Sequence, residues 1–219
     1  MQSAKAHSTY IPSRIDSGRV DTKSVELDPG MPPAAGVVNL SNADDLRWSA
    51  IVSLAPQAKV ALDIFAHNDM YLLKGSLIEQ DYQFQAGAFL CRSTDKGLRA
   101  GDDGATIFIY RDRVVNSCRE RTLQPAELEW HPAGVEGMAV APLLNTYHRL
   151  MLVSWLPHTR VGFHLHPRGE EIFVLQGELI DQHGRYPAGT WLRFYPGSGH
   201  APYTETLTLI LLRNGHLSH

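Results

Sequence analysis

The segment YLLKGSLIEQDYQFQAGAFL, residues 71–90, has a close counterpart in FVLQGELIDQHGRYPAGTWL, residues 173–192, at an offset of 102. Identical residues recur at this offset: Gly75 and Gly177, Leu77 and Leu179, Ile78 and Ile180, Gln80 and Gln182, Ala86-Gly87 and Ala188-Gly189, Leu90 and Leu192. The match continues without a gap to Gly97 and Gly199, Thr106 and Thr208, Arg111 and Arg213. A gapless match that includes glycines predicts an internal duplication of one unit of about 100 residues.

The rest of the chain is a series of short apolar or alternating runs. They cover residues 48–54, 70–74, 106–111, 150–156, 171–176, 191–195 and 207–213. Each has the length of a strand, and Gly, Pro, Asp or Asn lies between them. Long helical periodicity is missing, so the sequence predicts an all-β sandwich or barrel. We expect an N-terminal arm over residues 1–20, a first unit over 21–121 and a second over 122–219.

The composition excludes several classes of protein. The net charge of −3, from 20 Lys and Arg against 23 Asp and Glu, argues against a partner that is a nucleic acid. There is no apolar run of 18 residues and no apolar region of a signal peptide, so we expect a cytoplasmic protein without a membrane partner. The cysteines Cys91 and Cys118 have no metal-site spacing. Two reduced thiols are the simpler interpretation, and a disulfide is left open.

The second unit carries a cluster of metal-binding residue types within GFHLHPRGEEIFVLQGELIDQHGRYPAGTWLRFYPGSGH, residues 162–200. His164 and His166 are two residues apart, so their side chains lie on the same face of a strand. Glu170 begins the next strand after a turn, and His200 follows the turn at Gly197. Three imidazoles and one carboxylate predict a site for one divalent metal ion. The ligand set leaves Zn, Fe, Mn, Ni and Cu open.

The first unit serves as a control for this interpretation. At the offset of 102, the four candidate ligands fall on Leu62, Ile64, Asn68 and Leu98. The first unit is therefore expected to keep the fold without the metal. The alternative is a hydrogen-bonded polar cluster without a metal, which would bury a carboxylate at a cost. The remaining histidines are expected at the surface or with satisfied side chains, including His148, with His216 and His219 in the C-terminal tail. Trp191, Arg193, Tyr195 and Tyr203, which flank the site, are expected mostly to pack in the barrel.

The ligand spacing resembles the two motifs of the RmlC-like cupin superfamily. The first, G-x5-HxH-x3-4-E-x6-G, is matched by His164, His166, Glu170 and Gly177, although its leading glycine is displaced. The second, G-x5-PxG-x2-H-x3-N, is matched by Gly189, Gly197 and His200, with Tyr195 and Thr204 in place of its Pro and Asn. This resemblance implies a bicupin, with two tandem double-stranded β-helix barrels like jelly rolls.

Residues 123–213 resemble the cupin domain of ChrR-type anti-sigma factors more specifically, through Asp181, Tyr186, Arg193, Ser198 and His200. The resemblance implies a stress-related regulatory or sensing module with a sigma factor as partner. The H-x3-C-x2-C motif of the helical sigma-binding zinc domain is missing here, and the first barrel takes that place.

Two alternatives remain open. The site is also similar to that of non-haem dioxygenases acting on diketones or phenolic ketones. Under this interpretation the four ligands hold the metal, and the sequence identifies no further catalytic residue. A scaffold or small-molecule binding module is the third interpretation, and the cupin resemblance implies a homodimer.

Overall fold

The computed structural model describes residues 15–19, 35–42, 46–60, 68–92, 97–112 and 120–217. Its regular structure is β-strand apart from one short 3-10 helix, η1 (Pro125–Glu127). This confirms the predicted all-β class. Each of the seven predicted runs overlaps a strand to within one residue, and two of these strands extend well beyond the run. None of the helices among the described residues is long and apolar enough to cross a membrane.

The first unit is built on one antiparallel sheet. Its strands are β2 (Ala35–Asn39), β3 (Arg47–Leu54), β4 (Asn68–Glu79), β5 (Tyr82–Gln85), β6 (Phe89–Arg92), β7 (Arg99–Asp112) and β8 (Arg121–Leu123). They lie in the order β2-β3-β7-β4-β6-β8, and β5 pairs with β4. Alternate side chains of β3, β4 and β7 point to one face, where they form an apolar core around Leu72 and Ile107.

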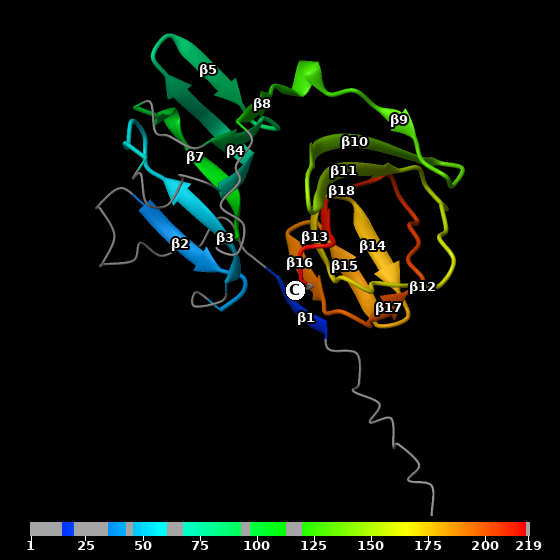
Figure 1. Ribbon diagram of the computed structural model, residues 1–219. Helices are drawn as coiled ribbons and strands as arrows, with labels where there is room; N and C mark the ends of the chain where they lie inside the picture. The colour runs from blue at the N-terminus through cyan, green and yellow to red at the C-terminus, as the bar shows by residue number, and fades with distance from the viewer. Residues whose placement is uncertain are drawn as a thin grey trace, which may run out of the picture.

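The second unit has a sheet in the order β1-β16-β13-β18-β11-β10-β9 and two smaller ladders, β12-β17 and β14-β15 (Figure 1). The main strands are β1 (Ile15–Arg19), β9 (His131–Pro132), β10 (Met138–Asn145), β11 (Arg149–Trp155), β13 (Glu170–Gln176), β16 (Thr190–Phe194) and β18 (Thr208–Asn214). The smaller ladders consist of β12 (His164–Leu165), β17 (Gly199–His200), β14 (Glu178–Asp181) and β15 (Gly184–Pro187). In Figure 1 these strands curve around a common interior.

Strand β1 lies within the stretch that the sequence assigns to an N-terminal arm. It pairs with β16 from Ile15 opposite Phe194 to Arg19 opposite Thr190. The chain therefore begins its described part at an edge of the second sheet before it forms the first unit. Residues 1–14 lie outside the described residues, and the predicted domain boundaries stay a prediction.

Strand pairing relates the two units in detail. Tyr71 pairs with Phe89 in the first unit, and Phe173 pairs with Trp191 in the second. These pairs keep the offset of 102 over residues 68–92 and 170–194.

The last strand departs from the gapless alignment. Leu72 pairs with Ile107, whereas its counterpart Val174 pairs with Ile210. The offset in this strand is thus 103, and the predicted match of Arg111 with Arg213 is wrong. The alignment failed because the apolar residues 107–109 of β7 and 209–212 of β18 match one another in either register.

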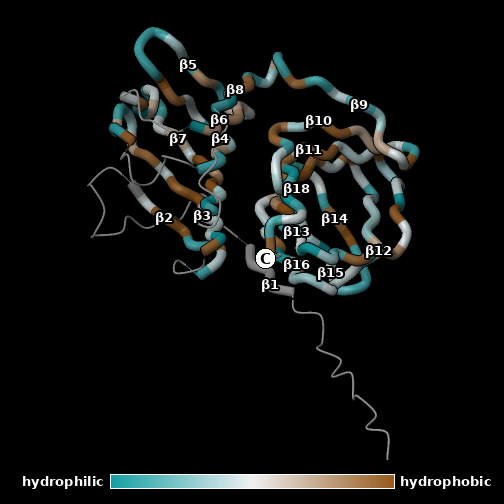
Figure 2. The backbone as a smooth tube through the Cα atoms, in the orientation of Figure 1, coloured by the Kyte–Doolittle hydropathy of each residue, from teal (hydrophilic) through white to brown (hydrophobic). Residues whose placement is uncertain are grey.

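The two units pack sheet against sheet through a shared apolar cluster. Its buried members are Ile51, Tyr71, Phe89, Cys91, Phe108, Tyr110, Ala141, Leu143, Leu144, Leu150, Leu152, Phe173, Trp191 and Leu211. The rings of Phe108 and Phe173, one from each unit, lie 5.0 Å apart. Each fully buried aromatic side chain of this kind contributes roughly 1.5–3 kcal/mol. The hydrophobic residues lie along the strands of both units in Figure 2. Cys118 lies outside the described residues.

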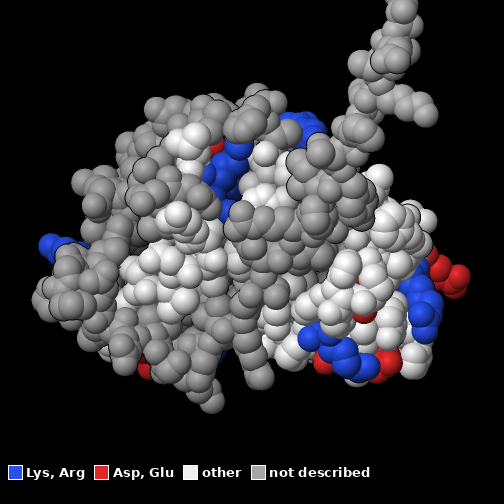
Figure 3. All heavy atoms as spheres, turned by 90° about the horizontal axis from the view of Figure 1, so that it is seen from below, with Lys and Arg blue, Asp and Glu red and all other residues white. Residues whose placement is uncertain are grey.

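The exposed charges of the second unit include close ion pairs. Arg185 contacts Glu178 at 2.6 Å and Glu205 at 2.7 Å. Figure 3 shows basic and acidic side chains next to one another at the edge of one face. Exposed pairs of this kind contribute little to stability.

Candidate metal centre

The structure brings the four predicted ligands together. One ligand atom from each of His164, His166, Glu170 and His200 lies within 4.8 Å of all the others. The three imidazole rings form an almost equilateral triangle, with centroids 5.0, 4.9 and 4.9 Å apart. His166, Glu170 and His200 are buried, whereas His164 is half-buried.

Local backbone geometry explains this convergence. His164 on β12 pairs directly with His200 on β17, which places their side chains next to each other. This pairing requires Gly199, because a Cβ there would lie 2.5 Å from the carbonyl oxygen of His164. The turn before His200 contains Gly197. A Cβ at this position would meet nothing within 4 Å, so the φ of +88° is the reason for glycine there.

A carboxylate behind the cluster orients His200. The Oδ2 atom of Asp181 accepts a hydrogen bond of 3.0 Å from Nδ1 of His200, which leaves Nε2 facing the cluster. The Oδ1 atom of Asp181 accepts from the backbone N–H of His183 at 2.7 Å and of Gly184 at 3.1 Å, and from the hydroxyl of Tyr186 at 3.0 Å. Burial alone would raise the pKa of Asp181, but these hydrogen bonds lower it below its usual value. Metal-bound histidines commonly have such a partner.

The cluster itself fits a cation. The Glu170 carboxylate lies 3.6 Å from Nδ1 of His166 and 3.7 Å from Nε2 of His200, too far for good hydrogen bonds. Nε2 of His166 is buried and has no hydrogen-bond partner among the described residues. Three nitrogens and one carboxylate are a donor set for Zn, Fe, Mn, Ni or Cu.

Electrostatics agrees with this fit. Burial, reinforced by the imidazoles of His200 and His164, lowers the pKa of His166 to about 3, so its ring is neutral as a ligand must be. Burial raises the pKa of Glu170 to about 8. A divalent cation between the four groups would offset this cost and favour the ionised carboxylate.

Two cavities meet at the cluster. The inner one, about 170 Å³, is mainly apolar and lies in the barrel, with walls formed by Met138, Val140, Met151, Val153, Trp155, Val161, His164, Glu170, Ile172, Leu179, His200, Pro202, Ile210, Leu212 and Asn214. The outer one, about 470 Å³, is more polar and is bounded by residues 145–149, 164–170, 214 and 215. Both touch His164 and Glu170. A ligand on the cluster would therefore have an apolar side and a polar side.

The first unit has no equivalent cluster among its described residues. Asn68 stands in the place of Glu170, because both begin the corresponding strand and pair with the same neighbouring strands. Leu62 and Ile64 lie outside the described residues.

The predicted counterpart of His200, Leu98, is wrong. Arg99 bridges Ile78 as Tyr203 bridges Ile180, so the offset at this point is 104. His200 therefore corresponds to residue 96, which is not described. Extra residues in the loop before the last strand account for the error, as they do for the register of β18.

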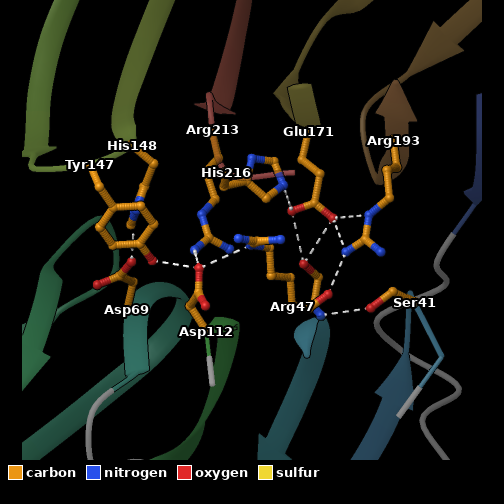
Figure 4. A network of polar contacts seen from close by, with 11 residues as sticks. Ser41, Arg47, Asp69, Asp112, Tyr147, His148, Glu171, Arg193, Arg213 and His216 are labelled. Carbon is orange, nitrogen blue, oxygen red and sulfur yellow. Dashed lines mark hydrogen bonds and ion pairs between the residues drawn. The ribbon is translucent and has the colours of Figure 1, made fainter. Parts of the chain in front are cut away.

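A second buried polar cluster lies behind the metal ligands, where the two units meet (Figure 4). The Glu171 side chain is fully buried, and its carboxylate contacts Arg193 at 2.6 Å, the hydroxyl of Ser49 at 3.0 Å and His216 at 3.2 Å. Burial would raise the pKa of Glu171, but Arg193 and His216 lower it to about 2. The sequence placed His216 in the tail, whereas its side chain is buried.

The turn before β11 also lies at the boundary between the two units and makes polar contacts with the first unit. The hydroxyl of Tyr147 donates to Asp112 at 2.6 Å, and Nε2 of His148 lies 3.2 Å from Asp69. His148 is buried, and of its two ring nitrogens Nε2 has a partner in Asp69 whereas Nδ1 has none among the described residues. No local signal identifies these contacts, because both partners belong to the other unit.

Comparisons with known proteins agree with this architecture. Residues 119–218 match the family model of the ChrR Cupin-like domain. No curated protein matches the chain. A candidate dioxygenase from Nostoc punctiforme is similar in structure, with a TM-score of 0.73 and 16% identity over 95% of this chain and 85% of that one.

Two further solved structures show the same likeness. The E. coli protein Ylba has a TM-score of 0.69 and 14% identity over 92% of this chain and 91% of that one. A variant of Bacillus subtilis oxalate decarboxylase has a TM-score of 0.63 and 13% identity over 94% and 78%. At these identities the likeness shows the fold alone. The family match therefore applies to residues 119–218 alone.

Proposed function

We propose that this chain is a metal-dependent cupin dioxygenase that acts on a small oxygenated substrate such as a diketone or a phenolic ketone. One observation carries the proposal: His164, Glu170 and His200, three of the four candidate ligands, line a mainly apolar cavity of about 170 Å³ inside the barrel. An apolar cavity of about 150 Å³ accommodates benzene, so this one suits a single ring or a short chain. A solved structure described as a candidate dioxygenase has the same fold.

The position of each residue in the site determines its proposed role. His164, His166, Glu170 and His200 would hold the ion, which would supply adjacent open positions for substrate oxygen atoms and O₂. Asp181 keeps the His200 proton on Nδ1, so that Nε2 remains available. The apolar walls, including Trp155, would exclude water and hold the carbon skeleton.

Metal analysis of tag-free protein beside a His164→Ala/His166→Ala variant is the first test. We expect close to one iron, manganese, nickel or copper per chain in the wild type and none in the variant. O₂ uptake with a β-diketone and a phenolic ketone then tests turnover. Val153→Phe, which fills the inner cavity, should keep the metal and lose uptake. Equal absence of metal from wild type and double variant, even after reconstitution, would refute the proposal.

A regulatory or sensing module is the second candidate function. It is favoured by the match of residues 119–218 to the ChrR Cupin-like domain. Three results together would favour this regulatory function over the dioxygenase function. Zinc would be the sole bound metal, O₂ uptake would be missing, and a sigma factor would co-purify. Ligand-dependent thermal shifts without turnover or a sigma factor would instead indicate a small-molecule binding module.

A further inference from the structure

The turn between β10 and β11, residues 145–149, forms one wall of the outer cavity that leads to the cluster. The opposite wall is the segment 164–170, which carries three of the four ligands. Arg168 joins the two walls, since its guanidinium donates to the backbone oxygen of Tyr147 at 3.3 Å. The position of the turn therefore sets the width of the opening above the ligands.

The side chains that fix this turn bind to the first unit (Figure 4). Tyr147 donates its hydroxyl to Asp112 at 2.6 Å, and His148 contacts Asp69 at 3.2 Å. The rings of Tyr147 and His148 stack edge to face, with centroids 4.4 Å apart, so the two anchors act on one rigid turn. Asp112 is itself held by Arg47 at 3.3 Å and by Arg213 at 3.7 Å.

The anchoring acids are well placed to resist movement. The Asp112 and Asp69 side chains are 6% and 10% exposed, and that of His148 is 3% exposed. Breaking a buried hydrogen bond leaves groups without partners, which costs more than the net strength of the bond. The turn is thus held from outside the barrel that it covers.

We propose that the first unit positions the mouth of the metal site: Asp69 and Asp112 hold the Tyr147–His148 turn, and the turn limits passage between solvent and the cluster. This inference rests on the proposed metal binding. It gives the first unit, whose described residues carry no such ligand cluster, a role in the chemistry of the second. Asp69 and Asp112 act as positioning residues because neither of them reaches the cluster.

The test uses the full-length protein loaded with Co²⁺ alone. Stoichiometry and visible spectrum are recorded first, and the rate of Co²⁺ removal by excess EDTA second. The variants are Tyr147→Phe, which removes one hydroxyl, and Asp69→Ala, which removes the other anchor. Phe108→Leu is the matched control, because it weakens the packing between the units without touching the turn.

We expect both anchor variants to bind one Co²⁺ with the wild-type spectrum and to release it at least about threefold faster, equivalent to about 0.7 kcal/mol. Phe108→Leu should release Co²⁺ at the wild-type rate. In the metal-free protein, hydrogen exchange at residues 145–149 should accelerate in the anchor variants and not in the control.

Several outcomes would overturn the inference. Release at the wild-type rate from both anchor variants, or equal acceleration by Phe108→Leu, would show that the turn does not limit access. Unchanged hydrogen exchange at the turn would show that the acids do not anchor it. Failure of the wild type to bind Co²⁺ would instead refute the proposed function, and the gating role with it, whatever the exchange data show.

Discussion

Replacing Asp181 by Asn tests how the second unit prepares a metal ligand. The carboxylate accepts the Nδ1 proton of His200 at 3.0 Å, and its other oxygen is fixed by three further donors, among them Tyr186. In the variant, the amide oxygen of the new Asn must face those three donors to accept their hydrogen bonds. Its NH₂ group then faces His200. The imidazole must then accept at Nδ1 and carry its proton on Nε2, where it can no longer bind a metal.

The magnitude follows from this change of tautomer. Loss of a partner that orients a metal ligand lowers metal affinity about 10- to 100-fold, or about 1.4 to 2.8 kcal/mol. His200 is 1% exposed, so no water can replace the lost acceptor, and we expect the upper end of this range. Competition against a chromophoric chelator at neutral pH, with Zn²⁺ as the probe, measures the affinity directly.

Tyr186→Phe is the matched control for Asp181→Asn. It removes one hydrogen bond to the same carboxylate but leaves the carboxylate facing His200. We expect its metal affinity to remain within about threefold of the wild type, since a single neutral hydrogen bond contributes about 0.5–1.5 kcal/mol and acts here only indirectly. Wild-type Zn²⁺ affinity in Asp181→Asn would refute the orienting role.

Three further predictions concern the stability of the fold. Glu171→Gln should lower the free energy of unfolding by about 3–5 kcal/mol, measured by urea denaturation, because it leaves the buried charge of Arg193 without its partner at 2.6 Å. His216 should make the protein less stable as the pH falls below about 6.5, because its buried ring has a pKa of about 4 and the unfolded chain takes up the proton first. At pH 5 this amounts to about 2 kcal/mol, and a His216→Gln variant whose stability falls equally between pH 7 and 5 would contradict it. Gly177→Ala should cost at least about 2 kcal/mol in the same assay, because φ is +75° and the new Cβ would lie 2.3 Å from the carbonyl oxygen of Leu207.

The fold was predictable where a periodic pattern continues for several residues. The seven runs and the matched glycines, such as Gly75 and Gly177, predict the main strands and their relation because side-chain alternation and positive φ leave a local signature. The sequence placed His164 and His166 on one strand, whereas β12 ends at Leu165 and His166 follows it. Strand β17 was not assigned, since two residues are too short to show alternation. The register of β18 was misplaced, because its apolar residues 209–212 match those of β7 in either register.

Some features of the candidate site were likewise predictable from a local pattern, and others were not. The spacing of His164, His166, Glu170 and His200 predicted their convergence, because it follows from strand geometry and two turns. The burial of His216 had no signal, since the partner that makes it tolerable, Glu171, is far away in the sequence. Contacts between the two units depend on the whole fold, and no local pattern reports them.

Adjacent residues on β13 and β4 show how the two roles are separated. Glu170 points into the barrel toward the other ligands, and Glu171, one residue later, points to the boundary between the units. Their counterparts are Asn68 and Asp69. The inward position has lost its carboxylate in the first unit, whereas the outward position has kept one and uses it to bind His148. Because successive strand residues face opposite sides, the interior of a unit can lose its ligand without disturbing the charged contacts that join it to the other unit.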